Sequence, residues 1–141
     1  MAQAGLIGRK RVLDSTALYD AVATQDTVTL IRSSIRALLR VVPTELENEL
    51  RAVIERDDDY TTPGKPSCDW DDAPARVALV DALARDAYAV LACLHARKLE
   101  REVNETAQLV ATVVGQDLDK GDDGIFRIAR RVAKDRIIST V

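Results

Sequence analysis

This sequence of 141 residues is poor in the side chains that most often build a chemical site, with one histidine and two cysteines. Cys68, Cys93 and His95 lack the close, regular spacing of a zinc site and form no disulfide framework, so we expect two free thiols in a reducing cytoplasm. The Gly64–Lys65 pair is not a phosphate-binding loop, because Asp59 stands where the Walker pattern needs a glycine. We therefore predict no complete active site, no cofactor and no small-molecule substrate for this chain.

Long apolar runs and an excess of positive charge are also missing. No apolar stretch reaches the roughly 18 residues that a membrane span needs, and the first eight residues lack the basic front of a secretory signal. We expect a cytoplasmic protein with no membrane partner. The formal net charge is −3, so contact with nucleic acid would depend on a local basic patch.

Aromatic residues are scarce at 4%, whereas 47% of the chain is hydrophobic. Leucine, valine, isoleucine and alanine must therefore build the core, and alanine and leucine favour helices. Apolar residues at spacings of three and four predict helices over about 17–22, 27–42, 44–54, 72–96, 102–115 and 123–136. These segments predict an all-α fold, a bundle of five to six helices with short extended ends.

Capping residues set the expected helix boundaries. Asp26 is expected to begin the second helix, Thr44 and Glu47 fit a capping box for the third, and Asp72 or the residue before it is expected to cap the fourth. In the 27–42 helix, Arg32 falls on a different face from the apolar residues.

Residues 57–72 form a predicted loop that is acidic and rich in proline and glycine. Trp70 is expected to fold back onto the core and pin this loop. A hard cation would need several of its carboxylates to converge, and the spacing of a calcium-binding EF-hand is missing. A solvated loop with one aspartate used as a helix cap is the favoured interpretation of its six aspartates, which are Asp57, Asp58, Asp59, Asp69, Asp71 and Asp72.

Four cations share one face of the helix predicted over about 123–136. They are Arg127, Arg130, Arg131 and Lys134, at spacings of three, four and seven. Such a row suits a phosphate backbone, because each contact releases counterions. A solvated face near a helix C-terminus, where cations favour the helix dipole, is the alternative.

Asp14 ends the short apolar stretch Arg9–Asp14, which could form a strand. From the residues alone, Asp14 is more simply the N-cap of the helix that follows. The alternative is a functional carboxylate at the end of a strand.

The segment RKRVLDSTALYDAVATQDTV, residues 9–28, resembles the region around the first catalytic aspartate of DDE-class transposases of bacterial insertion sequences. In that family a strand ends in an aspartate that is followed by a small residue and threonine, as in Asp14, Ser15 and Thr16. The segment GDDGIFRIARRVAKDRIISTV, residues 121–141, resembles the return towards the second half of the catalytic core. Residues 56–72 resemble the helical segment between these two landmarks, so the resemblance spans nearly the whole chain.

The resemblance implies a full enzyme in which three carboxylates hold two divalent ions, normally magnesium, for phosphodiester transfer. Asp14 corresponds to the first carboxylate and metal ligand, and the other two would lie beyond Val141. We therefore expect residues 1–16 to be a stub of the catalytic core, residues 17–141 to be a helical domain, and the isolated chain to be inactive. We expect a homodimer, formed through the stub or through apolar helix surface that once faced the catalytic core.

Two functions from different classes follow from these patterns. The first is a transposase fragment that contacts DNA, in keeping with an origin in DNA transposition and recombination. The second is a non-enzymatic helical module that binds a protein partner.

Overall fold

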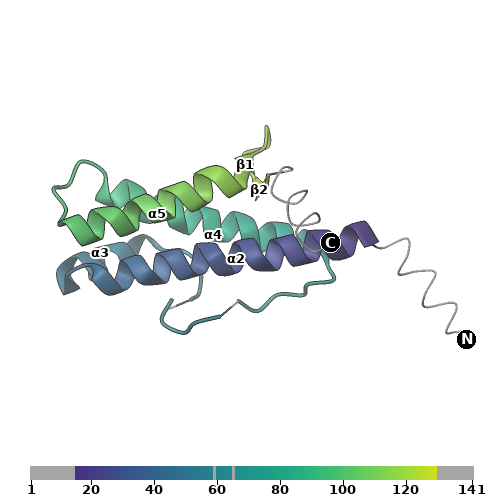
Figure 1. Ribbon diagram of the computed structural model, residues 1–141, viewed down its shortest axis with the longest axis horizontal. Coiled ribbons are helices and arrows are strands. Elements are labelled where there is room, and N and C mark those ends of the chain that lie inside the picture. Colours follow the sequence, from purple (N-terminus) through teal and green to yellow (C-terminus); the bar gives the residue numbers. More distant parts are fainter. Residues whose placement is uncertain (1–14, 59, 65, 130–141) are drawn as a thin grey trace, which may run out of the picture.

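The computed structural model describes residues 15–129 apart from residues 59 and 65 (Figure 1). This part of the chain holds four helices followed by a small two-stranded sheet, which confirms a mostly helical fold. The elements are α2 (Ser15–Val41), α3 (Thr44–Val53), α4 (Ala73–Leu94), α5 (Arg101–Asp117), β1 (Leu118–Lys120) and β2 (Phe126–Ile128).

Three long helices lie side by side and make up the body of the molecule. Helix α2 packs on both α4 and α5, and α4 also packs on α5. Figure 1 shows the short helix α3 at the end of the molecule opposite the sheet, where it packs on α4. Helix α5 spans the length between that end and the sheet, so the bundle has two distinct ends.

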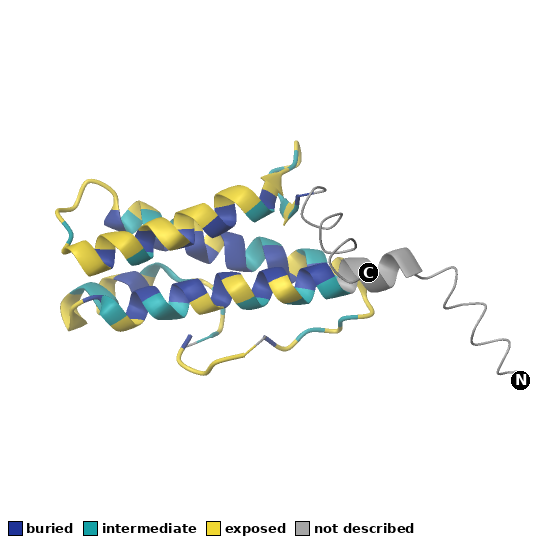
Figure 2. Cartoon of the chain, in the orientation of Figure 1, coloured by how far each residue is buried: buried dark blue, intermediate teal, exposed yellow. Residues whose placement is uncertain are grey.

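The core consists of aliphatic side chains from the inward faces of these helices (Figure 2). Their spacing of three and four residues along each helix is the pattern that predicted the helices. The core side chains with no exposed surface include Ile31, Ile35, Leu38, Leu83, Val90, Val110 and Val114.

The expected break at Asp26 is wrong, because α2 is continuous from Ser15 to Val41. No glycine or proline interrupts this segment, and an aspartate inside a helix costs only about 0.7 kcal/mol relative to alanine. Asp26 is exposed, while Ala23, Thr27 and Val28 beside it are buried. Burial of this continuous face outweighs the local preference of Asp26 for a cap, and one helix replaces the two that were predicted.

The helix predicted over about 123–136 is also wrong where the structure describes it, since Phe126–Ile128 forms β2. This strand pairs antiparallel with β1, with Leu118 opposite Ile128 and Lys120 opposite Phe126. Gly124, with a φ of 81°, makes the turn between the strands, and this left-handed conformation suits glycine. Residues 130–136 of the predicted helix lie outside the described residues.

The predicted boundaries of α3 and α4 hold better than the predicted caps. Helix α3 begins at Thr44, but its N-cap is Pro43 and the Thr44–Glu47 capping box does not form. Glu47 instead accepts a hydrogen bond from Arg51 at 2.8 Å. Asp72 is the N-cap residue of α4, as predicted, although its side chain makes no capping hydrogen bond.

The segment between α3 and α4 is a loop without a described helix or strand, as predicted. Trp70 is half-buried and packs against the hydrophobic core, which confirms its expected place. Cys68 in this loop and Cys93 in α4 are both free and half-buried. Among the described residues, no helix is long and apolar enough to cross a membrane.

Candidate functional site

Asp14 and three of the four predicted DNA-binding cations, Arg130, Arg131 and Lys134, lie outside the described residues. The structure does describe the end of the molecule where these segments join it. Helix α2 begins at Ser15, the residue after Asp14, and β2 contacts both α2 and α4. The last described strand therefore lies against the first described helix.

Arg127, the fourth predicted cation, lies on β2 and is exposed. Its guanidinium donates to both carboxylate oxygens of Asp123, at 3.2 and 3.0 Å. These hydrogen bonds, together with one from the backbone N–H of Ile125, lower the pKa of Asp123 to about 2. Asp123 is thus ionised at neutral pH, and it partly neutralises Arg127.

Helix α4 holds the hairpin in place through two polar side chains. Asp81 accepts a hydrogen bond from the backbone N–H of Phe126 at 3.0 Å and another from Arg85 at 2.8 Å. Arg85 also donates to the carbonyl of Gly124 in the turn at 2.9 Å. The hairpin is therefore fixed to α4 at its second strand and at its turn.

An aromatic pair with cations around it lies at the same junction. Tyr88 of α4 stacks on Phe126 of β2, with ring centroids 5.1 Å apart and an interplanar angle of 25°. The guanidinium of Arg85 and the ammonium of Lys120 lie over the Phe126 ring, at 6.0 and 5.7 Å from its centroid. We call these residues and Arg127 the hairpin platform.

A second polar cluster, absent from the sequence-based expectations, fixes the loop after α3. Arg32 of α2 donates to both carboxylate oxygens of Asp58, at 2.7 and 2.9 Å, and also to the carbonyl of Thr62. Arg56 donates to the same carboxylate at 2.5 Å. The Arg32 hydrogen bond is the main reason that the pKa of Asp58 lies well below its ordinary value, because it outweighs the opposing effect of burial.

Asp86 of α4 is the other carboxylate of this cluster and is only 1% exposed. It accepts hydrogen bonds from the Tyr60 hydroxyl at 2.7 Å and from the backbone N–H of Glu55 at 2.9 Å. Burial, and then the neighbouring Asp86, raise the pKa of Tyr60 well above its ordinary range. We call Arg32, Arg56, Asp58, Tyr60 and Asp86 the loop clamp.

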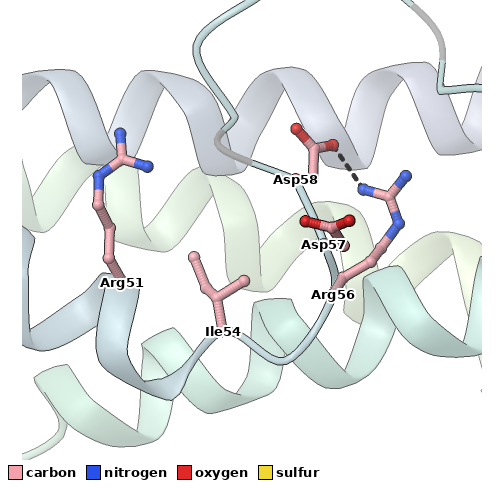
Figure 3. Close-up of a pocket in the computed structure, with 5 residues that line it drawn as sticks. All are labelled: Arg51, Ile54, Arg56, Asp57 and Asp58. Carbon is pink, nitrogen blue, oxygen red and sulfur yellow. Dashed lines mark hydrogen bonds and ion pairs between the residues drawn. The ribbon is translucent and has the colours of Figure 1, made fainter.

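The loop clamp has no side chain placed for chemistry. Its carboxylates and guanidiniums bind one another or the backbone, so none of them is available as a base or a nucleophile. An adjacent pocket of about 260 Å³ is lined by Arg51, Ile54, Arg56, Asp57 and Asp58 (Figure 3). Arg51 is bound to Glu47 and Arg56 to Asp58, so the ion pairs on its rim leave little charge for a ligand.

The described aspartates of the acidic loop have separate surroundings. Asp57 is exposed, Asp69 accepts from the backbone N–H of Asp71 at 3.2 Å, and Asp72 is the N-cap residue of α4. No group of three histidine, cysteine or acidic side chains is placed to hold a metal ion within the described part of the chain. Asp58 departs from the expectation of a solvated loop, because it is bound to two arginines.

Two positions carried a sequence signal for the loop clamp. Asp86 interrupts the apolar face of α4 between Leu83 and Val90, and Arg32 follows the buried Ile31. A charged residue among buried positions needs a partner of opposite charge or several hydrogen bonds. The pattern indicates such a need, but it does not identify the partners, which lie 26 to 30 positions away in the sequence. Arg32 binds Asp58, and Asp86 accepts from Tyr60 and from the backbone N–H of Arg56.

Comparisons with known proteins add no relative. No family model, no curated protein and no solved structure matches this chain. The transposase resemblance therefore stays a proposal that rests on the residues that suggested it.

We predict that Tyr60→Phe destabilises the fold by about 1.5–3 kcal/mol, the usual cost of losing a buried hydrogen bond to a charged group. The lost partner is one carboxylate oxygen of Asp86. Urea unfolding followed by circular dichroism measures the change. Tyr88→Phe is the matched control, since Tyr88 is 40% exposed, and its effect should stay within about 0.5 kcal/mol. Equal effects of the two substitutions would contradict a stabilising role for the buried Tyr60–Asp86 hydrogen bond.

The lowered pKa of Asp58 predicts a specific loss of stability in acid. The Arg32–Asp58 pair is fully formed above the ordinary aspartate pKa of 3.8. Below that pH, the unfolded chain binds a proton that the folded chain does not, so stability falls by at most about 1.4 kcal/mol per pH unit from this group. Asp58→Asn should flatten this acid dependence in urea titrations between about pH 5 and pH 2. Asp57→Asn removes the same charge at an exposed neighbour and is the control. A slope in Asp58→Asn equal to that of the unsubstituted chain would refute the prediction.

Proposed function

We propose that this chain is part of a DDE-class transposase and that the helical unit 15–129 is inserted into its catalytic core. Asp14 would supply the first of three metal-binding carboxylates, at the end of the strand that precedes α2. The segment 121–141 would lead back to the core, beginning at the hairpin.

The observation that supports this proposal is that β2, the last described element, contacts α2, the first. An inserted unit must leave and re-enter its host at neighbouring points, which is why insertions are tolerated where chain ends lie close together. Helix α2 starts directly after Asp14, and β2 at the other end of the unit contacts α2.

Magnesium would supply Lewis-acid and water-activating chemistry in the complete enzyme. The described residues offer no group of three side chains that could hold a metal ion. We therefore derive no catalytic step from the described part of the helical unit. Its proposed contribution to DNA transposition is to position DNA.

The proposed DNA contact consists of Arg127, Arg130, Arg131 and Lys134. Changing all four to alanine should weaken binding to a labelled DNA duplex and reduce the salt dependence of binding, by about 0.9 in logarithmic slope for each phosphate that is no longer neutralised. Fluorescence anisotropy of the full chain at several salt concentrations measures both effects. The control changes Arg40, Arg97, Lys98 and Arg101 to alanine, which removes the same charge from exposed positions elsewhere. Equal weakening by both variants, or no duplex binding by the unsubstituted chain, would reject this contact.

A substitution at Asp123 should strengthen duplex binding in the same assay, the opposite effect to that of the alanine variant. Asp123→Asn removes the charge that holds Arg127 but keeps an oxygen to accept from Ile125. Duplex binding should tighten by up to about fivefold, the scale of a surface ion pair. Asp122→Asn makes the same change in net charge at the next residue and should tighten binding less.

A second candidate function, a helical protein-interaction module, is favoured by the outer face of α5. The exposed residues along its second half carry no charge, and Leu109 among them is 48% exposed. These residues are Gln108, Leu109, Ala111, Thr112, Gly115 and Gln116. A side chain on Gly115 would meet no atom within 4 Å, so a partner could approach the backbone closely there.

The partner we propose for this face is a second copy of the chain, in keeping with the expected homodimer. Leu109→Lys should shift a dimer to monomer in light scattering at high protein concentration, because it places a charge within an uncharged contact. Leu30→Lys, at a leucine of α2 with a similar exposure of 42%, is the control. A strict monomer of the unsubstituted chain would refute the homodimer.

A further inference from the structure

Tyr88 is the exposed aromatic side chain among those whose burial the structure describes. It is 40% exposed, whereas Tyr60 is buried and Trp70 and Phe126 are half-buried. Phe126 supports one side of Tyr88 by stacking. An aromatic ring held rigidly from below, with much of its surface in solvent, is suited to stacking on a flat ligand.

Two cations lie over the Phe126 ring on which Tyr88 stacks. The guanidinium of Arg85 is 6.0 Å from the ring centroid and is held by Asp81 at 2.8 Å. The ammonium of Lys120 reaches the same ring from the opposite strand, at 5.7 Å from its centroid. An aromatic ring bordered by lysine and arginine is the arrangement with which proteins bind single-stranded nucleic acid, the ring taking a base and the cations taking phosphates.

We propose that Tyr88 is a stacking site for an unpaired base of DNA, with Arg85 and Lys120 placed for the adjoining phosphates. This inference rests on the proposed function, because it names the form of DNA that the helical unit holds. A base within a duplex is already stacked on both sides, whereas an unpaired base has a free face for Tyr88.

The charge balance around the platform distinguishes this site from a duplex-binding surface. The exposed carboxylates of Asp119, Asp122 and Asp123 lie on the same hairpin and offset its cations. Few counterions are therefore released on binding, and the affinity comes mainly from stacking. Binding of a single strand should depend less on salt than binding of a duplex through the cations of segment 127–134.

The position of the platform agrees with such a role. It lies on α4 and the β1–β2 hairpin, and β2 contacts the helix that begins directly after Asp14. In a transposase, an unpaired base held at this end of the unit would lie on the side from which the strand of Asp14 leaves. The helical unit would then position a DNA end for the carboxylates of the core.

The test uses the full chain and fluorescently labelled oligothymidine, with binding followed by anisotropy at low salt. Tyr88→Ala and Tyr88→Leu should each weaken binding by about tenfold, the usual effect of removing one stacking ring. Tyr88→Phe, which keeps the ring, should bind like the unsubstituted chain. Leu30→Ala, at a position on α2 with a similar exposure of 42%, is the control and should have no effect.

Tyr88→Leu distinguishes the loss of base stacking from the loss of the packing that supports the hairpin. Leucine still packs on Phe126 but has no aromatic face, so retained binding in this variant would overturn the proposal. Circular dichroism and thermal unfolding confirm that each variant is folded. If duplex binding persists while all Tyr88 variants bind oligothymidine equally well, the stacking site fails and the proposed function stands. If the unsubstituted chain binds neither form of DNA, both fail.

Discussion

The hydrogen-bonded carboxylate of Asp86 is the constraint on which much of this structure depends. A nearly fully buried carboxylate is costly unless its hydrogen bonds are satisfied. Here the backbone N–H of Glu55 and the hydroxyl of Tyr60 satisfy it, and both come from the loop that follows α3. The loop therefore has to cross α4 at this point. Asp58 then fixes the same loop to Arg32 of α2, so two carboxylates connect three segments that are distant in sequence.

Helix α4 transmits this constraint to the other end of the molecule. Its buried face carries Asp86 within the loop clamp, while Asp81, Arg85 and Tyr88 on other faces hold the hairpin. The same helix packs on α2, α3 and α5. Because one helix makes all these contacts, the place of the hairpin relative to α2 is set by α4. The contact between β2 and α2 is thus a consequence of the core and is not due to the hairpin alone.

The sequence predicted those elements that local patterns determine. The helices over 44–53, 73–94 and 101–117 follow from apolar spacing, with Pro43 and Pro74 marking the start of the first two and a polar stretch separating the last two. The loop follows from Pro63, Gly64 and Pro66. The continuity of α2 at Asp26 and the hairpin at Phe126 were missed, because burial against other segments decided them. The clamp was missed for a related reason, since its charged residues meet partners that no local spacing reveals.

Ion pairing also explains how an acidic chain can present cations at one end. The chain carries 23 acidic and 20 basic residues, and many of its described arginines bind a carboxylate, as Arg32, Arg85 and Arg127 do. Such pairs hold guanidiniums in fixed directions but reduce their long-range field. A surface of this kind attracts DNA weakly from a distance and acts mainly on contact. That property is compatible with the proposed role of positioning a DNA end, because such a role needs contact with the DNA and not its capture from a distance.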